Sequence, residues 1–209
     1  MQRLLQRPSL VIFIVIIIMV GCAYVPTQEM SDARQAIKAA REVKAIAYVP
    51  ANLTIAEQSL TTAEHYLEAG QFNQARLNAK LATEQAVNAY KMTVAITRAN
   101  TMRQSLTTMG YATQTVNDLL EQAMTSAQQQ ETDKTITLAN EAYHQAELSL
   151  NQAQLEQAHL MIEKIQAQHE ANLNQNELMI LKSAQIAYRR YQGRKAYDLI
   201  INLYNKLFY

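Results

Sequence analysis

The chain has 209 residues, 19 of them Lys or Arg and 18 Asp or Glu, which gives a formal net charge of +1. This near balance excludes the strongly basic surface that nucleic-acid-binding proteins need. Only four glycines and three prolines interrupt a composition that is 49% hydrophobic. The abundant Ala, Gln, Leu and Glu residues have fair to high helix propensity, so the composition predicts an all-α protein.

The first 21 residues have the layout of an export signal. Arg3 and Arg7 precede eleven unbroken apolar residues, Leu10 to Val20. At about 1.5 Å per residue this stretch spans about 16 Å, or half of a bilayer core, and a positive start followed by such a segment is typical of a secretory leader. We therefore expect residues 1–21 to be a cleaved signal peptide rather than a membrane span.

The end of this leader, Met19-Val20-Gly21-Cys22, resembles the lipobox of bacterial lipoproteins. The resemblance implies that the Cys22 thiol receives a diacylglyceryl group and that the chain is cleaved before it. A lone cysteine in an exported chain has no disulfide partner, which also favours acylation, and several acyl chains on one residue make a stable anchor. The alternative is an ordinary leader with a spare thiol. We expect no cofactor beyond the covalent lipid on Cys22.

The residue after the cysteine bears on the location of the protein. It is Ala23, where an Asp is the familiar inner-membrane retention signal of enteric bacteria. We therefore expect a lipid-anchored protein of the bacterial cell envelope, at the outer membrane and facing the periplasm. Residues 22–30 would then form the lipidated cysteine and a linker.

Apolar residues after the linker recur at steps of three and four, the pattern of a helix with one buried face. Three such stripes are Ala33, Ala36, Ala40, Val43 and Ala47; Leu53, Ala56, Leu60, Ala63 and Leu67; and Phe72, Ala75, Ala79, Ala82, Ala86, Ala89, Thr93 and Ile96. Because small residues let helices approach closely, we expect elongated antiparallel helical hairpins or a coiled-coil-like bundle. The expected parts are a first alanine-rich hairpin region at 31–109, a second at 111–181, and a basic, tyrosine-rich helical segment at 182–209.

Residues suited to helix starts and ends separate these stripes. They are Ser31, Pro50, Gly70, Gly110, Thr132 and Asp133. From Lys134 no such breaker appears before Gly193, although three asparagines mark an expected break, Asn172, Asn174 and Asn176. An internal repeat with a spacing of 64 relates Leu60, Ala63, Phe72, Ala75, Ala82 and Ala89 to Met124, Ala127, Ile136, Ala139, Ala146 and Ala153. This spacing predicts a second hairpin with its turn near Lys134.

A family resemblance rests on three groups of residues in the first hairpin region. They are Tyr48-Val49-Pro50-Ala51, the turn Glu68-Ala69-Gly70-Gln71-Phe72, and the alanines at 75, 79, 82, 86 and 89. Residues 31 to 95 resemble the alanine-rich domain of unknown function 4398 family, found in bacterial envelope lipoproteins. The turn is also similar to that of tetratricopeptide-type helical hairpins. The family implies no activity, so no catalytic residue follows from the resemblance.

The reactive side chains form no catalytic or metal-binding pattern. The four histidines, His65, His144, His159 and His169, are scattered, and His169-Glu170 lacks the second histidine that a zinc-protease helix needs. The sequence contains neither a glycine-rich phosphate loop nor a serine in a nucleophile elbow. With Cys22 acylated, no thiol remains as a nucleophile. We therefore expect neither an enzyme nor a metal site.

The C-terminal segment 182–209 carries six basic side chains against one acidic. Because basic side chains mixed with tyrosines are typical of surfaces that contact partners or polymers, we take eight residues as candidate contacts: Lys182, Tyr188, Arg189, Arg190, Tyr191, Arg194, Lys195 and Tyr197. The alternative is an amphipathic hairpin around Gly193 that packs its apolar residues, Tyr191 among them, and leaves the bases in solvent.

Two functions remain open. The first is a non-enzymatic envelope scaffold that presents helix faces to envelope protein partners or to further copies of itself. The second is a module that binds peptidoglycan or lipid A of lipopolysaccharide through the basic, aromatic segment, with Arg and Lys gripping carboxylates or phosphates and Tyr stacking on sugar rings.

Overall fold

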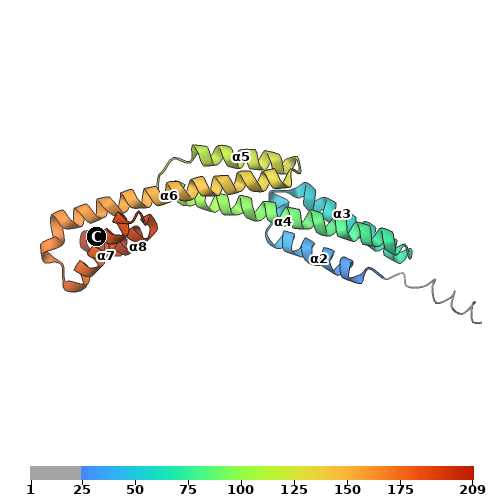
Figure 1. Ribbon diagram of the computed structural model, residues 1–209, viewed down its shortest axis with the longest axis horizontal. Helices are drawn as coiled ribbons and strands as arrows, with labels where there is room; N and C mark the ends of the chain where they lie inside the picture. The colour runs from blue at the N-terminus through green and yellow to red at the C-terminus, as the bar shows by residue number, and fades with distance from the viewer. Residues whose placement is uncertain (1–24) are drawn as a thin grey trace, which may run out of the picture. The chain divides into compact units, whose positions relative to one another are not determined.

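The computed structural model describes residues 25–209, which are helical apart from short connections. The signal peptide and Cys22 therefore lie outside the described residues. Numbered as in Figure 1, the helices are α2 (Thr27–Glu42), α3 (Pro50–Glu68), α4 (Phe72–Thr108), α5 (Gln114–Gln128), α6 (Thr132–His169), α7 (Gln175–Arg189) and α8 (Gly193–Phe208), with 3-10 helices η1 (Ala45–Ala47) and η2 (Glu170–Asn172). No strand occurs in residues 25–209. The predicted all-α fold class is confirmed.

The described chain divides into two compact units, residues 25–46 with 50–90 and residues 47–49 with 91–209. The first unit is formed by α2, α3 and the N-terminal part of α4. Its core joins all three helices, because Met30, Ala63 and Ala79 pack together with Leu60 and Leu67 around them. Three ion pairs also link its helices: the exposed pairs Arg34–Glu64 and Arg41–Glu57 and the partly buried pair Arg76–Glu29.

The seams of small residues that the sequence predicts are observed. Ala75, Ala79, Ala82, Ala86 and Ala89 have no exposed area at all, and the same face of α4 continues through buried Met92, Thr93 and Ile96. Ala139, Ala142, Ala146 and Ala153 are buried in the same way along α6. The first stripe is only partly buried, because Ala33 and Ala40 are in the core whereas Ala47 is exposed.

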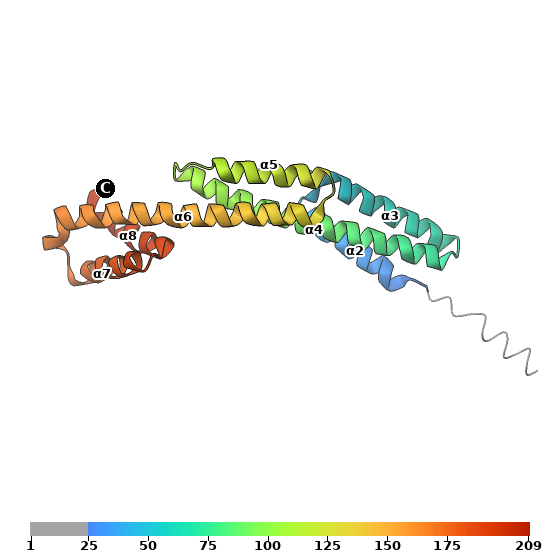
Figure 2. The same ribbon diagram turned by 45° about the horizontal axis from the view of Figure 1, so that its top comes forward.

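In the second unit, α6 contacts both α5 and α8, and α8 also packs against α7. Figure 2 shows α5 along the N-terminal half of α6 and α8 along its C-terminal half. The C-terminal core is richer in large side chains than the alanine seams, with Ile162, Ile165, Leu181, Ile200 and Leu203 all buried. Along residues 25–209 no helix has the length and apolar character needed to cross a bilayer.

The helix boundaries confirm the expected break among the asparagines and correct one expected start. After α6 ends at His169, η2 follows, and Asn174 caps α7 in a capping box with Glu177. The amide of Glu177 donates to Asn174 Oδ1 at 3.0 Å, and the amide of Asn174 donates to Glu177 Oε2 at 2.9 Å. Ser31, expected to cap the first helix, lies inside α2, which begins at Thr27. Helical structure therefore reaches into the expected linker 22–30.

The internal repeat has a spacing of 60 to 61 residues, so the expected spacing of 64 is wrong. Three hairpin turns each place one residue in the left-handed region, Gly70 (φ 71°), Gln130 (φ 60°) and Tyr191 (φ 56°). In each turn the amide of the next residue donates to the carbonyl five residues before it: Gln71 to Tyr66, Glu131 to Ser126, and Gln192 to Ala187. The hairpins are α3–α4, α5–α6 and α7–α8, with equivalent buried residues such as Ala63, Ala123 and Ala184.

The error has a simple cause. A shift of four residues is close to one helical turn, so both spacings match the buried face. Only the turn fixes the register along the helix, and Gln130 does not look like a helix end, because Gly and Asn are the residues that usually adopt a left-handed conformation.

Candidate functional site

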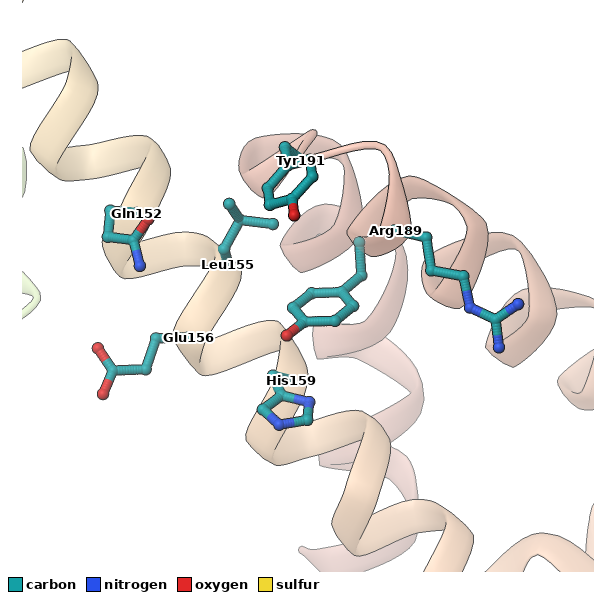
Figure 3. A pocket seen from close by; sticks show the side chains of 7 residues that line it. Gln152, Leu155, Glu156, His159, Arg189 and Tyr191 are labelled. Atoms are coloured by element: carbon teal, nitrogen blue, oxygen red, sulfur yellow. The ribbon is translucent and has the colours of Figure 1, made fainter.

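A cleft of about 580 Å³ lies within the second unit, between α6 and the turn that joins α7 to α8. One wall is a single face of α6, with Gln152, Leu155, Glu156 and His159. The other wall is the end of α7 and its turn, with Tyr188, Arg189 and Tyr191. Figure 3 shows Tyr191 beside Leu155, and the Arg189 side chain pointing away from Glu156.

A ring stack joins the two walls of the cleft. The rings of His159 and Tyr188 lie 5.0 Å apart and within 9° of parallel. His159 also places Nε2 3.4 Å from Oε1 of Glu163, one turn further along α6. Tyr188 packs against the C-terminal core, so its ring is held from both sides. The stack therefore fixes two aromatic rings in the lining of the cleft.

Glu156 is held by a residue from a different turn. The Tyr111 hydroxyl donates to Glu156 Oε2 at 3.1 Å, and the same hydroxyl lies 3.3 Å from the carbonyl oxygen of Ala153. Partial burial, and then the hydrogen bond to Glu156, raises the pKa of Tyr111 above its ordinary value. Tyr111 follows Gly110, whose positive φ of 79° ends α4. The turn after α4 therefore positions the carboxylate at the edge of the cleft.

Asn151 fixes the α7–α8 turn onto α6. Its Oδ1 accepts from the amide of Gly193 at 2.9 Å, and its Nδ2 donates to the carbonyl of Tyr191 at 3.3 Å. A Cβ on Gly193 would lie 2.2 Å from the main-chain oxygen of Asn151, so the two helices meet at a distance only glycine allows. The turn that carries Tyr191 is therefore attached rigidly to the opposite wall.

The structure brings only some of the eight candidate contact residues together. Tyr188, Arg189 and Tyr191 line the cleft, whereas Arg194 and Lys195 line a separate hollow beside Asn151. Lys182 and Arg190 are exposed and belong to neither, and Tyr197 packs on the core. The segment forms the amphipathic hairpin that was the alternative expectation. The expectation of a packed Tyr191 is wrong, because this residue is 80% exposed.

Several cleft residues escaped the sequence analysis. The sequence patterns place His159 among the scattered histidines and do not single out Gln152 or Glu156 as site residues. Their spacing carried a signal, since residues 152, 155, 156 and 159 recur at steps of three and four and so share one helix face. What the sequence does not show is that this face of α6 meets the turn at Tyr191, because the two lie about 40 residues apart in the chain.

A second polar contact locks the last hairpin. The Lys206 ammonium lies 2.7 Å from Glu177 Oε1, which joins α8 to the start of α7. The hydrogen bond from Lys206, and then the backbone bond at Asn174, lowers the pKa of Glu177. Lys206 is thus an anchor of the fold rather than a free cation. Within residues 25–209, no group of three His, Cys, Asp or Glu side chains is arranged to hold a metal ion.

The helices and their matched turns define an all-α protein built from repeated helical hairpins. Residues 28–105 match the family described as Domain of unknown function (DUF4398), which confirms the predicted resemblance to this family over that stretch. The match includes α2, α3 and most of α4, while the cleft lies beyond it. No curated protein and no solved structure matches the chain.

Proposed function

We propose that the chain is a lipid-anchored, non-enzymatic protein of the bacterial cell envelope that acts as a helical scaffold for protein partners in the periplasm. A groove of about 840 Å³ in the second unit supports this role. It is lined by residues of α4, α6 and α8 and includes Met102, Met109 and Leu148. Leu148 is 66% exposed, and flexible methionine side chains suit surfaces that accept protein partners.

A matched pair of substitutions on α6 tests the scaffold role. Leu148→Glu places a charge in the groove, and we expect loss of the envelope proteins that crosslink to the wild-type chain in intact cells. Gln145→Glu adds the same charge at another exposed position of α6 that does not line the groove, so its crosslinks should persist. Identical crosslinking patterns for both variants would exclude this groove as the partner surface.

The envelope location is supported by the sequence of the leader. Arg3, Arg7, the apolar run and the lipobox-like Met19-Val20-Gly21-Cys22 favour export and acylation. Cys22→Ser should block incorporation of labelled palmitate and leave the precursor uncleaved. A Cys22→Ser protein that was processed and fractionated with the outer membrane like the wild type would contradict the anchor.

A second function is favoured by the cleft and its basic surroundings. Binding of peptidoglycan or lipid A would use Arg189, Arg194 and Lys195, which are exposed around the α7–α8 turn. Sedimentation with insoluble peptidoglycan at two salt concentrations tests it, since binding through exposed charges weakens with salt. Substituting Gln for these three residues is the suitable variant, because deleting α8 would uncover Ile162 and Ile165. Sedimentation unchanged by salt and by these substitutions would argue against it.

A further inference from the structure

Tyr191 occupies a backbone conformation that does not suit its side chain. Its φ of 56° lies in the left-handed region, where bulky residues are rare. Within residues 25–209 the other positive-φ residues are Gly70, Gly110, Gln130 and Lys44, none of them aromatic. With 80% of its surface exposed, the Tyr191 ring gains little packing in return. Strain without compensating burial indicates a residue retained for contact with another molecule.

The strained residue is also held still. Its amide donates to the carbonyl of Tyr188 at 2.9 Å, and its own carbonyl accepts from Asn151 Nδ2 at 3.3 Å. Two residues later, the amide of Gly193 donates to Asn151 Oδ1 at 2.9 Å. The ring therefore projects from a fixed backbone, and a ligand that stacks on it does not have to order the turn.

The chemistry of the cleft favours an uncharged, hydroxyl-rich ligand. The lining charges nearly cancel, with one carboxylate on Glu156 and one guanidinium on Arg189. The amide of Gln152 and the carboxylate of Glu156 line the same cleft as the exposed Tyr191 ring, which lies beside Leu155. Such a combination can stack on the apolar face of a sugar ring and hydrogen-bond its hydroxyl groups at the edge.

A peptide fits this cleft less well. One wall is a helix and the other is the end of α7 with its turn, whose amides and the carbonyl of Tyr191 are already bonded, so neither wall offers a free strand edge. A helical peptide would need several apolar anchor pockets, whereas Leu155 is the sole aliphatic residue of the lining. We propose that the cleft around Tyr191 is a carbohydrate site that binds pyranose rings of a glycan chain, an inference that rests on the second proposed function.

Titration of the full chain with two soluble probes, cellotetraose and chitotetraose, tests the site in a detergent without sugar groups. We expect at least one of them to bind the wild type. Tyr191→Gly should weaken that binding by about tenfold or more, as loss of one aromatic stack does. The same change should raise the midpoint of thermal unfolding by about 2–4 °C, because glycine relieves the left-handed strain.

Gln130→Gly is the matched control, since it makes the same change at the equivalent turn of the second hairpin. It should raise the thermal midpoint in the same way and leave glycan binding unchanged. Tyr191→Phe should retain binding within a few-fold, because the ring face remains. These results together would indicate that Tyr191 contacts the ligand. A role in packing would instead make Tyr191→Gly destabilising.

Four results would overturn the carbohydrate site. The first is that the wild type binds neither sugar. The second and third are that Tyr191→Gly binds the sugars as tightly as the wild type, or that the thermal midpoint of Tyr191→Gly falls. The fourth is that the wild type binds tetralysine more tightly than either sugar. If peptidoglycan sedimentation is lost with the Gln substitutions but not with Tyr191→Gly, the second proposed function stands and the carbohydrate site fails.

Discussion

Gly193→Ala tests how closely the last hairpin is docked on α6. The new Cβ would lie 2.2 Å from the main-chain oxygen of Asn151, so α8 must move away from α6. This overpacking also weakens the hydrogen bond from the Gly193 amide to Asn151 Oδ1. Together the two effects should lower the free energy of unfolding by about 2–4 kcal/mol. In the wild type this hydrogen bond is 2.9 Å long.

Gly110→Ala is the control, because it lies in the same unit, has a φ of 79° and has open space around the position of a Cβ. Backbone strain alone should cost about 1 kcal/mol there. Urea unfolding gives the two free energies, and amide exchange in α7 and α8 localises the effect, with faster exchange expected for Gly193→Ala alone. Equal destabilisation by the two changes would refute the close approach at Asn151.

Three further predictions address the core, a buried hydroxyl and a pH dependence. Ile200→Ala should lower the free energy of unfolding by about 2–5 kcal/mol, because Ile200 is fully buried. The control Asp198→Ala removes only an exposed 3.8 Å ion pair with Arg194 and should change this free energy by less than about 0.5 kcal/mol. Denaturant unfolding measures both. Thr93→Val should raise the free energy of unfolding by about 1 kcal/mol, since the buried Oγ1 of Thr93 has no hydrogen-bond partner. A lower free energy of unfolding would show that the hydroxyl does have a partner. The lowered pKa of Glu177 contributes stability above the ordinary value of 4.5 that is lost as the pH falls through the lowered pKa, so Lys206→Gln should flatten this acid dependence in unfolding curves taken across that range.

The helical fold could be predicted because its determinants are local. Alanine stripes at steps of three and four identify the buried faces, and Gly70 and Gly110 mark two turns at positive φ. Thr132 correctly marks the start of α6, but the repeat spacing places the turn near Lys134 instead of at Gln130, and the prediction of a packed Tyr191 is wrong, because neither Gln nor Tyr signals a left-handed conformation. Local chemistry thus specified the helices but not every position at which the chain reverses.

The cleft could be predicted only in part. The basic, aromatic composition of the C-terminal segment indicated Tyr188, Arg189 and Tyr191, all of which line it. The opposite wall depends on which face of α6 meets this segment, and that is decided by the packing of Ile162 and Ile165 against α8. Such a choice between helix faces follows from three-dimensional packing and has no counterpart in a motif.

Because α6 belongs to the α5–α6 hairpin and also packs against α8 of the last hairpin, it affects how the second unit unfolds. The helix spans Thr132–His169 and contacts α5 as well as α8, so neither neighbour can detach without uncovering part of it. Opening of the last pair would bring Ile162 and Ile165 into water at once. The second unit is therefore expected to melt cooperatively, and the turn that carries Tyr191 shares the rigidity of the whole assembly instead of fraying as a chain terminus does.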